Sequence, residues 1–341
     1  MAADTTAPAG STAPGWGRTA RQQGHALLTP STAVLRRIAL AGVLASAGII
    51  LTGAAVRLSQ SGLGCPDWPA CTATSVVAGG TTGDPLIHRW IEFGNRLVTV
   101  AIFVVAVTVC VAGWRFRDGS GRLRRDLAWL AAAQPAAIVL QAVLGGIVVL
   151  TRLNPVWVSV HFLASMALVA AAVALYVRCG EGSAPARPLV RPEVRLLAGG
   201  MVAVVALMLA AGTVVTGTGP LAGARSVARY QLPLSGVTQL HADIGWLLGG
   251  LVIALVLGLR LSGAPGRAMR LGWLLLALVG LQGAIGYIQY FTGLPAGLVW
   301  VHVAGSVLIW ITALLLLFAL RERGALSPAL SPALSRDLPL R

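Results

Sequence analysis

The sequence predicts an all-α membrane protein whose eight transmembrane helices form two parallel, pseudo-symmetric four-helix bundles. Three observations support this prediction: the composition, an internal repeat and a one-sided distribution of arginine. Of the 341 residues, 56% are hydrophobic and 11% are charged, and the mean hydropathy is +0.80. A chain of this composition is typical of integral membrane proteins rather than of soluble domains.

Eight apolar runs approach the ~20 residues that a helix needs to cross a bilayer. The second run is the least regular, because Glu92, Asn95 and Arg96 lie in its first turns. The runs lie at about 38–57, 92–113, 127–150, 157–177, 197–217, 239–259, 271–291 and 298–320.

The internal repeat links residues 140–165 with residues 281–306. At an offset of 141 residues the two segments are identical at ten of 26 positions, and His161 matches His302. Each copy is an apolar run, a short turn with a proline, and a second apolar run with one histidine near its start. This pattern predicts a transmembrane helical hairpin in each half of the chain.

The net charge of +15 comes entirely from arginine, since the chain contains no lysine. Twenty of the 26 arginines fall on one side of the predicted bundle. By the positive-inside rule, we expect a multi-pass protein of the cell membrane with both termini in the cytoplasm. The lipid bilayer is therefore the expected partner of this charge, and we expect no nucleic acid.

The apolar runs and the composition of the segments around them divide the chain into five parts. Residues 1–34 and 324–341 are expected to be a disordered cytoplasmic tail and a mobile C-terminal tail. Residues 35–179 and 197–323 form the two four-helix halves, and the Pro-rich segment 180–196 links them in the cytoplasm. Because four spans return the chain to its starting side, both halves run in the same direction.

Four histidines, His88, His161, His241 and His302, lie at or near the extracytoplasmic start of an even-numbered helix. A neutral imidazole inside the bilayer is costly unless something binds it, and histidine is a common ligand of metals and of haem iron. The alternative is that each histidine only hydrogen-bonds a neighbouring backbone carbonyl. The layer of matching positions favours metal ligation over that alternative.

Aligning TQLHADIG (238–245) with EFGNRLVT (92–99) places His241 opposite Asn95. The second half then has two histidines, His241 and His302, which suit the two axial positions of a haem. The first half has only His161, because an Asn amide is a poor ligand of haem iron. A haem in that half would be five-coordinate with one open face.

His88 lies seven residues before Asn95, about two turns or ~10 Å along a helix. It could replace the missing ligand only if the helix began differently, and an interface role is the preferred interpretation.

Glu92 lies three residues before Asn95, on the same helix face. A carboxyl group at that depth could transfer protons beside the open face of a haem. The alternative is a salt bridge with Arg89 or Arg96. We favour the catalytic role.

Cys65 and Cys71 flank PDWPA in the first outer loop, where two cysteines most often form a disulfide. The disulfide could be a structural staple or could exchange electrons with a partner thiol. Cys110 and Cys179 are expected to be inert thiols. Five outer arginines could pair with haem propionates, although snorkelling explains each equally well; they are Arg57, Arg89, Arg152, Arg225 and Arg229.

The segment TGAAVRLSQSGLGCPDWPAC, the acid of Glu-x-x-Asn-Arg and the doubled Gln-to-His hairpin resemble the heme A synthase family over residues 38–322. The resemblance implies a haem b cofactor between His241 and His302. It also implies that the N-terminal half oxidises the ring D methyl of haem o to a formyl group, giving haem a. The family's acid falls on Glu92, its second N-terminal histidine on His161, and its cysteine pair on Cys65 and Cys71.

The chain departs from the family where Asn95 replaces the first N-terminal histidine. We therefore expect an oxidoreductase with an open face on the substrate haem. It would receive haem o from a haem o synthase (protohaem farnesyltransferase), exchange electrons with an unidentified redox partner and supply an aa3-type terminal oxidase. The sequence is compatible with a homo-oligomer but does not specify one.

Two other functions stay open at this point. A diheme b-type electron-transfer protein would need four good iron ligands, and the pairing of Asn95 with His161 argues against it. A parallel-repeat transporter would use the histidines as an ion path and would have helices broken at mid-membrane. The apolar runs show no paired interruptions there.

Overall fold

The computed structural model describes residues 29–78 and 85–324, so the predictions for most of both tails lie outside the described residues. Within this part of the chain, eight helices are long and apolar enough to cross a membrane. The chain is an all-α, multi-pass membrane protein, as the sequence predicts. The helices are α2 (Thr32–Leu58), α3 (Leu86–Arg115), α4 (Arg125–Leu150), α5 (Pro155–Arg178), α6 (Pro192–Thr218), α7 (Leu234–Leu261), α8 (Gly266–Phe291) and α9 (Ala296–Ala319).

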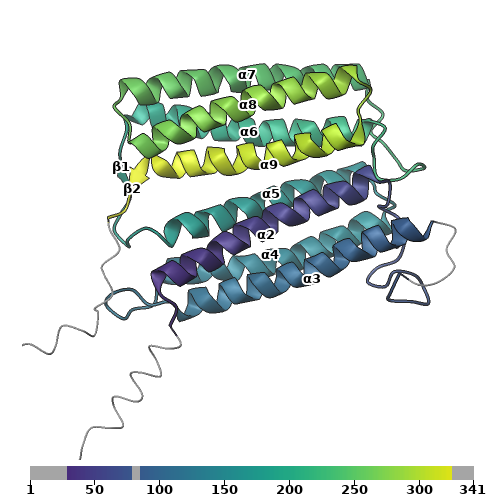
Figure 1. The fold of residues 1–341 in the computed structure, drawn as a ribbon, viewed down its shortest axis with the longest axis horizontal. Coiled ribbons are helices and arrows are strands. Elements are labelled where there is room, and N and C mark those ends of the chain that lie inside the picture. The colour runs from purple at the N-terminus through teal and green to yellow at the C-terminus, as the bar shows by residue number, and fades with distance from the viewer. Residues whose placement is uncertain (1–28, 79–84, 325–341) are drawn as a thin grey trace, which may run out of the picture.

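The helices form two groups, α2 to α5 and α6 to α9 (Figure 1). In the first group, α2 packs on α3, α3 on α4, α4 on α5, and α5 closes the ring on α2. In the second group, α6, α7, α8 and α9 follow one another in the same way, and α9 closes on α6. In each ring the second and fourth helices therefore lie diagonally opposite each other. A symmetry axis between the halves stays a prediction.

The two halves meet where α5 packs on α6 and α9, and where α2 packs on α9. The largest apolar core lies at this interface and includes Val169 of α5, Val205 of α6 and Leu316 of α9, all almost fully buried. Two indole groups of α9 add hydrogen bonds across it. Trp300 donates to the Leu51 carbonyl and Trp310 to the Met166 carbonyl, each at 2.9 Å.

Several helices begin earlier than their apolar runs. The first starts at Thr32, within the predicted tail, because the Ser31 side chain accepts a hydrogen bond from the Val34 N–H and caps it. The segment predicted as a linker is helical from Pro192, a residue well suited to a first helical position. Helix α3 starts at Leu86, six residues before its run, so Glu92 lies inside the helix.

At the end of the helix bundle opposite the first outer loop, two features that the sequence did not predict join neighbouring helices. Strand β1 (Arg187–Pro188) pairs antiparallel with β2 (Arg321–Glu322), next to the last helix (Figure 1). Beside them, Asp126 of α4 pairs with Arg124 and Arg178, and Glu181 pairs with Arg178 at 2.8 Å. Together they hold the ends of α4, α5, α6 and α9 close to one another.

Candidate functional site

His241 and His302 face each other across the second half. Their helices, α7 and α9, are diagonally opposite, yet the two ring centroids are only 6.3 Å apart. An iron bound by two imidazoles, at about 2.0 Å to each nitrogen and about 1.1 Å more to each ring centre, holds the centroids about 6.2 Å apart. The spacing of the two rings therefore matches that of two axial ligands on one iron.

The neighbouring helices leave room for these rings. A Cβ atom at Gly212 of α6 would lie 3.3 Å from Cε1 of His241, and one at Gly286 of α8 would lie 3.3 Å from Cε1 of His302. The Gln282 side chain donates to the His302 carbonyl at 2.7 Å and so fixes the start of α9. Glycine at both positions allows each imidazole to lie close against the adjacent helix.

In both rings Nδ1 lies on the edge that packs against the neighbouring helix, 3.8 Å from a Cβ placed at Gly212 or at Gly286, so Nε2 is the nitrogen left to bind an iron. Nδ1 of His241 and Nδ1 of His302 are buried and have no hydrogen-bond partner among the described residues. Nowhere in the described ranges do three His, Cys, Asp or Glu residues gather closely enough to hold a bare metal ion. Two imidazoles suit a group that brings its own remaining ligands, and a porphyrin does so.

The first half repeats only one side of this arrangement. His161 on α5 lies against Gly145 of α4, where a Cβ would be 3.5 Å from its Cε1, and its buried Nδ1 also has no partner among the described residues. On the diagonally opposite helix, Asn95 accepts a hydrogen bond from the Thr52 hydroxyl at 2.7 Å. The first half therefore has an imidazole on one side and an amide–hydroxyl pair on the other.

Glu92 is buried and holds the first outer loop. Its carboxylate accepts a hydrogen bond from the Cys65 N–H at 2.7 Å and pairs with Arg96 at 2.8 Å. Arg96 also donates to the carbonyls of Cys65 and Ala70. The salt bridge with Arg96, which was the alternative to a catalytic role, is thus present. The side chain does not face lipid, and its catalytic role stays a prediction.

Cys65 and Cys71 form a disulfide and are both fully buried. Between them, Trp68 packs on α4 so closely that a Cβ at Gly146 would lie 2.6 Å from its ring. A buried disulfide is poorly placed to meet a partner thiol, which favours the role of a staple. Cys179 is also buried, and burial raises the pKa of its thiol to about 12, so it is a poor nucleophile at neutral pH.

His88 lies in the packing between the outer loop and α3. Its Nδ1 is 2.8 Å from the Ser61 hydroxyl, and a Cβ atom at Gly64 would clash with the His88 carbonyl. This placement favours the interface role over that of a replacement ligand.

The family of cytochrome oxidase assembly proteins, COX15-CtaA, matches residues 36–314. The chain belongs to this family. It is 25% identical to the heme A synthase of Shewanella oneidensis over 77% of this chain and 90% of the relative. It is 32% identical to the heme A synthase of Symbiobacterium thermophilum over 47% of this chain and 49% of the relative. A protoheme IX farnesyltransferase of Chloroflexus aurantiacus is 34% identical over 34% of this chain and 18% of that protein.

Membership of the cytochrome oxidase assembly family does not show which of the outer arginines would pair with haem propionates. Each nitrogen of the Arg57 guanidinium donates a hydrogen bond within the protein, to Thr216 or to the Leu221 carbonyl, and Arg57 so joins the two halves. Arg229 donates to the Pro220 carbonyl at 3.3 Å. Arg152 and Arg225 are exposed. These two are the better placed for propionates, and their pairing stays a prediction.

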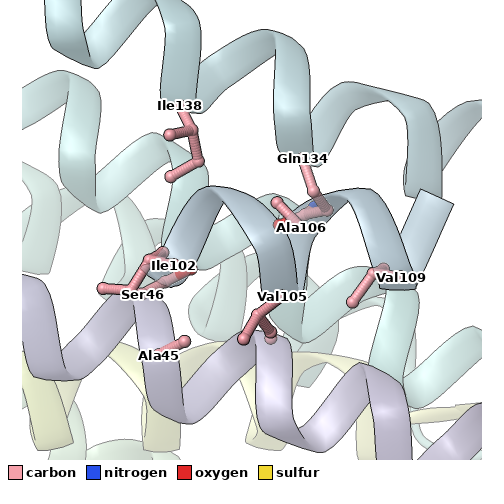
Figure 2. Close-up of a pocket in the computed structure, with 9 residues that line it drawn as sticks. Ala45, Ser46, Ile102, Val105, Ala106, Val109, Gln134 and Ile138 are labelled. Atoms are coloured by element: carbon pink, nitrogen blue, oxygen red, sulfur yellow. The ribbon is translucent and has the colours of Figure 1, made fainter. Parts of the chain in front are cut away.

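A small cavity lies between α2, α3 and α4 of the protein (Figure 2). Its volume is about 10 Å³, which is room for a single water molecule. Buried Ser46 and Gln134 supply polar groups in its otherwise apolar lining. The cavity lies about two helical turns from Asn95 along α3, since Ile102 lines it, and it is far too small for a porphyrin.

Sequence reasoning missed Thr52 and Gly212. Both occur in a short repeat, AGIILTG at 47–53 and AGTVVTG at 211–217, that links α2 with α6. A comparison of the first helix of each half would have revealed it. The partners of Thr52 and Gly212 lie on adjacent helices, so only the packing shows what each residue contacts.

Proposed function

We propose that this protein is a heme A synthase. It oxidises the ring D methyl of haem o through an alcohol to a formyl group, and the product haem a serves an aa3-type terminal oxidase. The observation that carries the proposal is the difference between the halves. Two imidazoles face each other at 6.3 Å in one half, and one imidazole lies opposite a hydrogen-bonded amide in the other.

In the C-terminal half, His241 and His302 would hold haem b as a resident cofactor. Bound there, haem b supplies one-electron transfer between the substrate half and an external redox partner. The protein's own contribution is to fix the two rings, and Gly212, Gly286 and Gln282 do so. Their contacts leave each imidazole little freedom to turn away from the other.

In the N-terminal half, His161 would bind the iron of the substrate and orient the porphyrin, while Asn95 leaves the other face open. Glu92 would handle the protons released as the methyl group is oxidised. Its place one turn from Asn95 on α3 supports this role, and the bonds to Cys65 and Arg96 fix its carboxylate. The disulfide loop above it would support the site by limiting access of water.

The two alternative functions are less well supported. A diheme electron-transfer protein needs two ligands in each half, and the Asn95 amide is already engaged by Thr52. A transporter of the parallel-repeat class uses helices broken at mid-membrane. Among the described residues, each of the eight spans is one continuous helix.

We further propose a plasma-membrane location with both termini in the cytoplasm, in line with the arginine distribution. A haem o synthase would deliver the substrate.

The proposed function is tested by haem analysis of cells that lack this protein and of the same cells after re-expression. Haems are extracted and separated by chromatography. We expect haem o to accumulate in the deletion strain and haem a to appear only after re-expression. Haem a in the deletion strain at normal levels would contradict the proposal.

Replacing Glu92 with Gln should stop haem a formation while haem b stays bound. Gln has nearly the same shape and keeps an oxygen for the Cys65 N–H, but it cannot take up a proton and it loses the ion pair with Arg96. We expect haem a to fall by at least tenfold, since general acid–base groups typically contribute 10²–10⁴-fold. The measurement is haem chromatography together with the low-spin haem b spectrum.

The matched control for this change is Glu193→Gln, the same substitution at an exposed position in the first turn of α6. It should leave both haems unchanged. Normal haem a in the Glu92→Gln strain would show that the carboxylate serves only the loop.

A further inference from the structure

We infer that Thr52 is a positioning residue of the substrate site, which fixes the Asn95 amide so that its N–H groups face a small ligand on the open side of the substrate iron. This inference rests on the proposed function, because it needs a haem on His161. The inference gives a role to Asn95, which lies at the position where the C-terminal half has His241 as a proposed second iron ligand. Four observations on α2, α3, α6 and α9 carry it.

The first observation is the volume beside Asn95. In the second half, the His241 ring packs against Gly212 of α6, and a Cβ atom placed on Gly212 would lie 3.3 Å from Cε1 of that ring. The matching position of the first half is Gly48 of α2, where no atom of a neighbouring helix lies within 4 Å of such a Cβ. In the second half the His241 ring fills this space. In the first half the shorter Asn95 side chain takes the place of the histidine, and the space beside Gly48 is not filled by protein.

The second observation is the direction of the Asn95 amide. The Thr52 hydroxyl has one hydrogen, and its distance to Asn95 Oδ1 is 2.7 Å, against 3.1 Å to the Ile49 carbonyl. With Oδ1 taken by this donor, the two N–H groups on Nδ2 point away from Thr52. Among the described residues, no protein group accepts a hydrogen bond from them. The amide thus has two donors to offer to a ligand.

The third observation is that the second half does not share this pair. Thr216 matches Thr52 in the short repeat, yet it accepts a hydrogen bond from Arg57 and donates to the Thr213 carbonyl. The hydroxyl of this position serves the interface in one half and the site in the other. The different use coincides with the replacement of a histidine by Asn95 at the facing position.

The fourth observation is that Thr52 is held from the other half. The Trp300 indole donates to the carbonyl of Leu51, the residue before Thr52. Trp300 lies two residues before His302, a proposed ligand of haem b. The backbone that carries the Thr52 hydroxyl is therefore fixed to the helix that would carry the cofactor. A side chain with this support can hold the amide in one orientation.

The test compares two small iron ligands in the full-length protein with its substrate-site haem. Fluoride, which binds ferric iron, accepts hydrogen bonds strongly, whereas carbon monoxide, which binds ferrous iron, accepts them poorly. Thr52→Val removes the hydroxyl and keeps the shape of the side chain. We expect fluoride to bind about tenfold more weakly, the loss that corresponds to one hydrogen bond to a charged group. Carbon monoxide affinity should change much less.

Thr52→Ser is the matched control, because it keeps the hydroxyl and should retain tight fluoride binding. The low-spin haem b spectrum reports that each variant is folded. Equal losses of fluoride and carbon monoxide in Thr52→Val would overturn the inference, as would unchanged fluoride binding. If the wild-type protein with haem on His161 binds neither ligand, the iron has no open face and the inference is overturned, whereas the proposed function is judged separately by whether the same protein forms haem a.

Discussion

His302→Ala is expected to abolish the low-spin haem b spectrum of the purified protein. His302 is one of two rings whose centroids are 6.3 Å apart, and no other imidazole among the described residues lies in that bundle. Without it the iron loses one axial ligand, and the remaining His241 can give at most a five-coordinate, high-spin haem. The measurement is the visible spectrum of the reduced protein together with its haem content.

His88→Ala is the control for this prediction. It removes an imidazole at the loop, where His88 contacts Ser61 rather than a haem site. The low-spin spectrum should be unchanged in this variant. A low-spin spectrum that survives His302→Ala, or one that disappears in His88→Ala, would show that the ligands are assigned wrongly.

Asn95→His is expected to convert the substrate-site haem from high spin to low spin. The change restores the Glu-x-x-His-Arg pattern to which this chain is otherwise similar. The open space beside Gly48 leaves room for the added ring, as Gly212 does for His241 in the other half. The new imidazole would then bind the iron opposite His161, and the site should lose carbon monoxide binding almost completely.

Asn95→Gln is the matched control, since a longer amide occupies the same space but is a poor iron ligand. Its haem should stay high spin and continue to bind carbon monoxide. Electron paramagnetic resonance of the ferric proteins separates the two spin states. A high-spin site in Asn95→His would mean that Asn95 does not lie over the iron.

Much of the fold follows from the sequence because the bilayer imposes it. Each span must be an apolar helix of sufficient length, and seven of the eight predicted runs lie within observed helices, while the eighth, 298–320, ends one residue beyond Ala319. Helix ends were predicted less well, because they depend on local groups such as the Ser31 cap and not on hydropathy. The strand pair β1–β2 joins residues more than 130 positions apart, and a pattern of apolar runs cannot reveal it.

The candidate site was predictable to the extent that it is repeated. The doubled hairpin pointed to His161 and His302, and the alignment of helices pointed to His241 and Asn95. The disulfide followed from two cysteines close together in one loop. Contacts between unlike elements could not be predicted, since nothing in the sequence shows that the Cys65 N–H meets Glu92 or that Thr52 meets Asn95.

The most direct test of this account is a count of haem spin states in the purified wild-type protein with both sites filled. Electron paramagnetic resonance should show one low-spin haem, held by His241 and His302, and one high-spin haem on His161. Only the second should respond to carbon monoxide after reduction. Two low-spin haems, neither of which binds carbon monoxide, would contradict the proposed difference between the two halves.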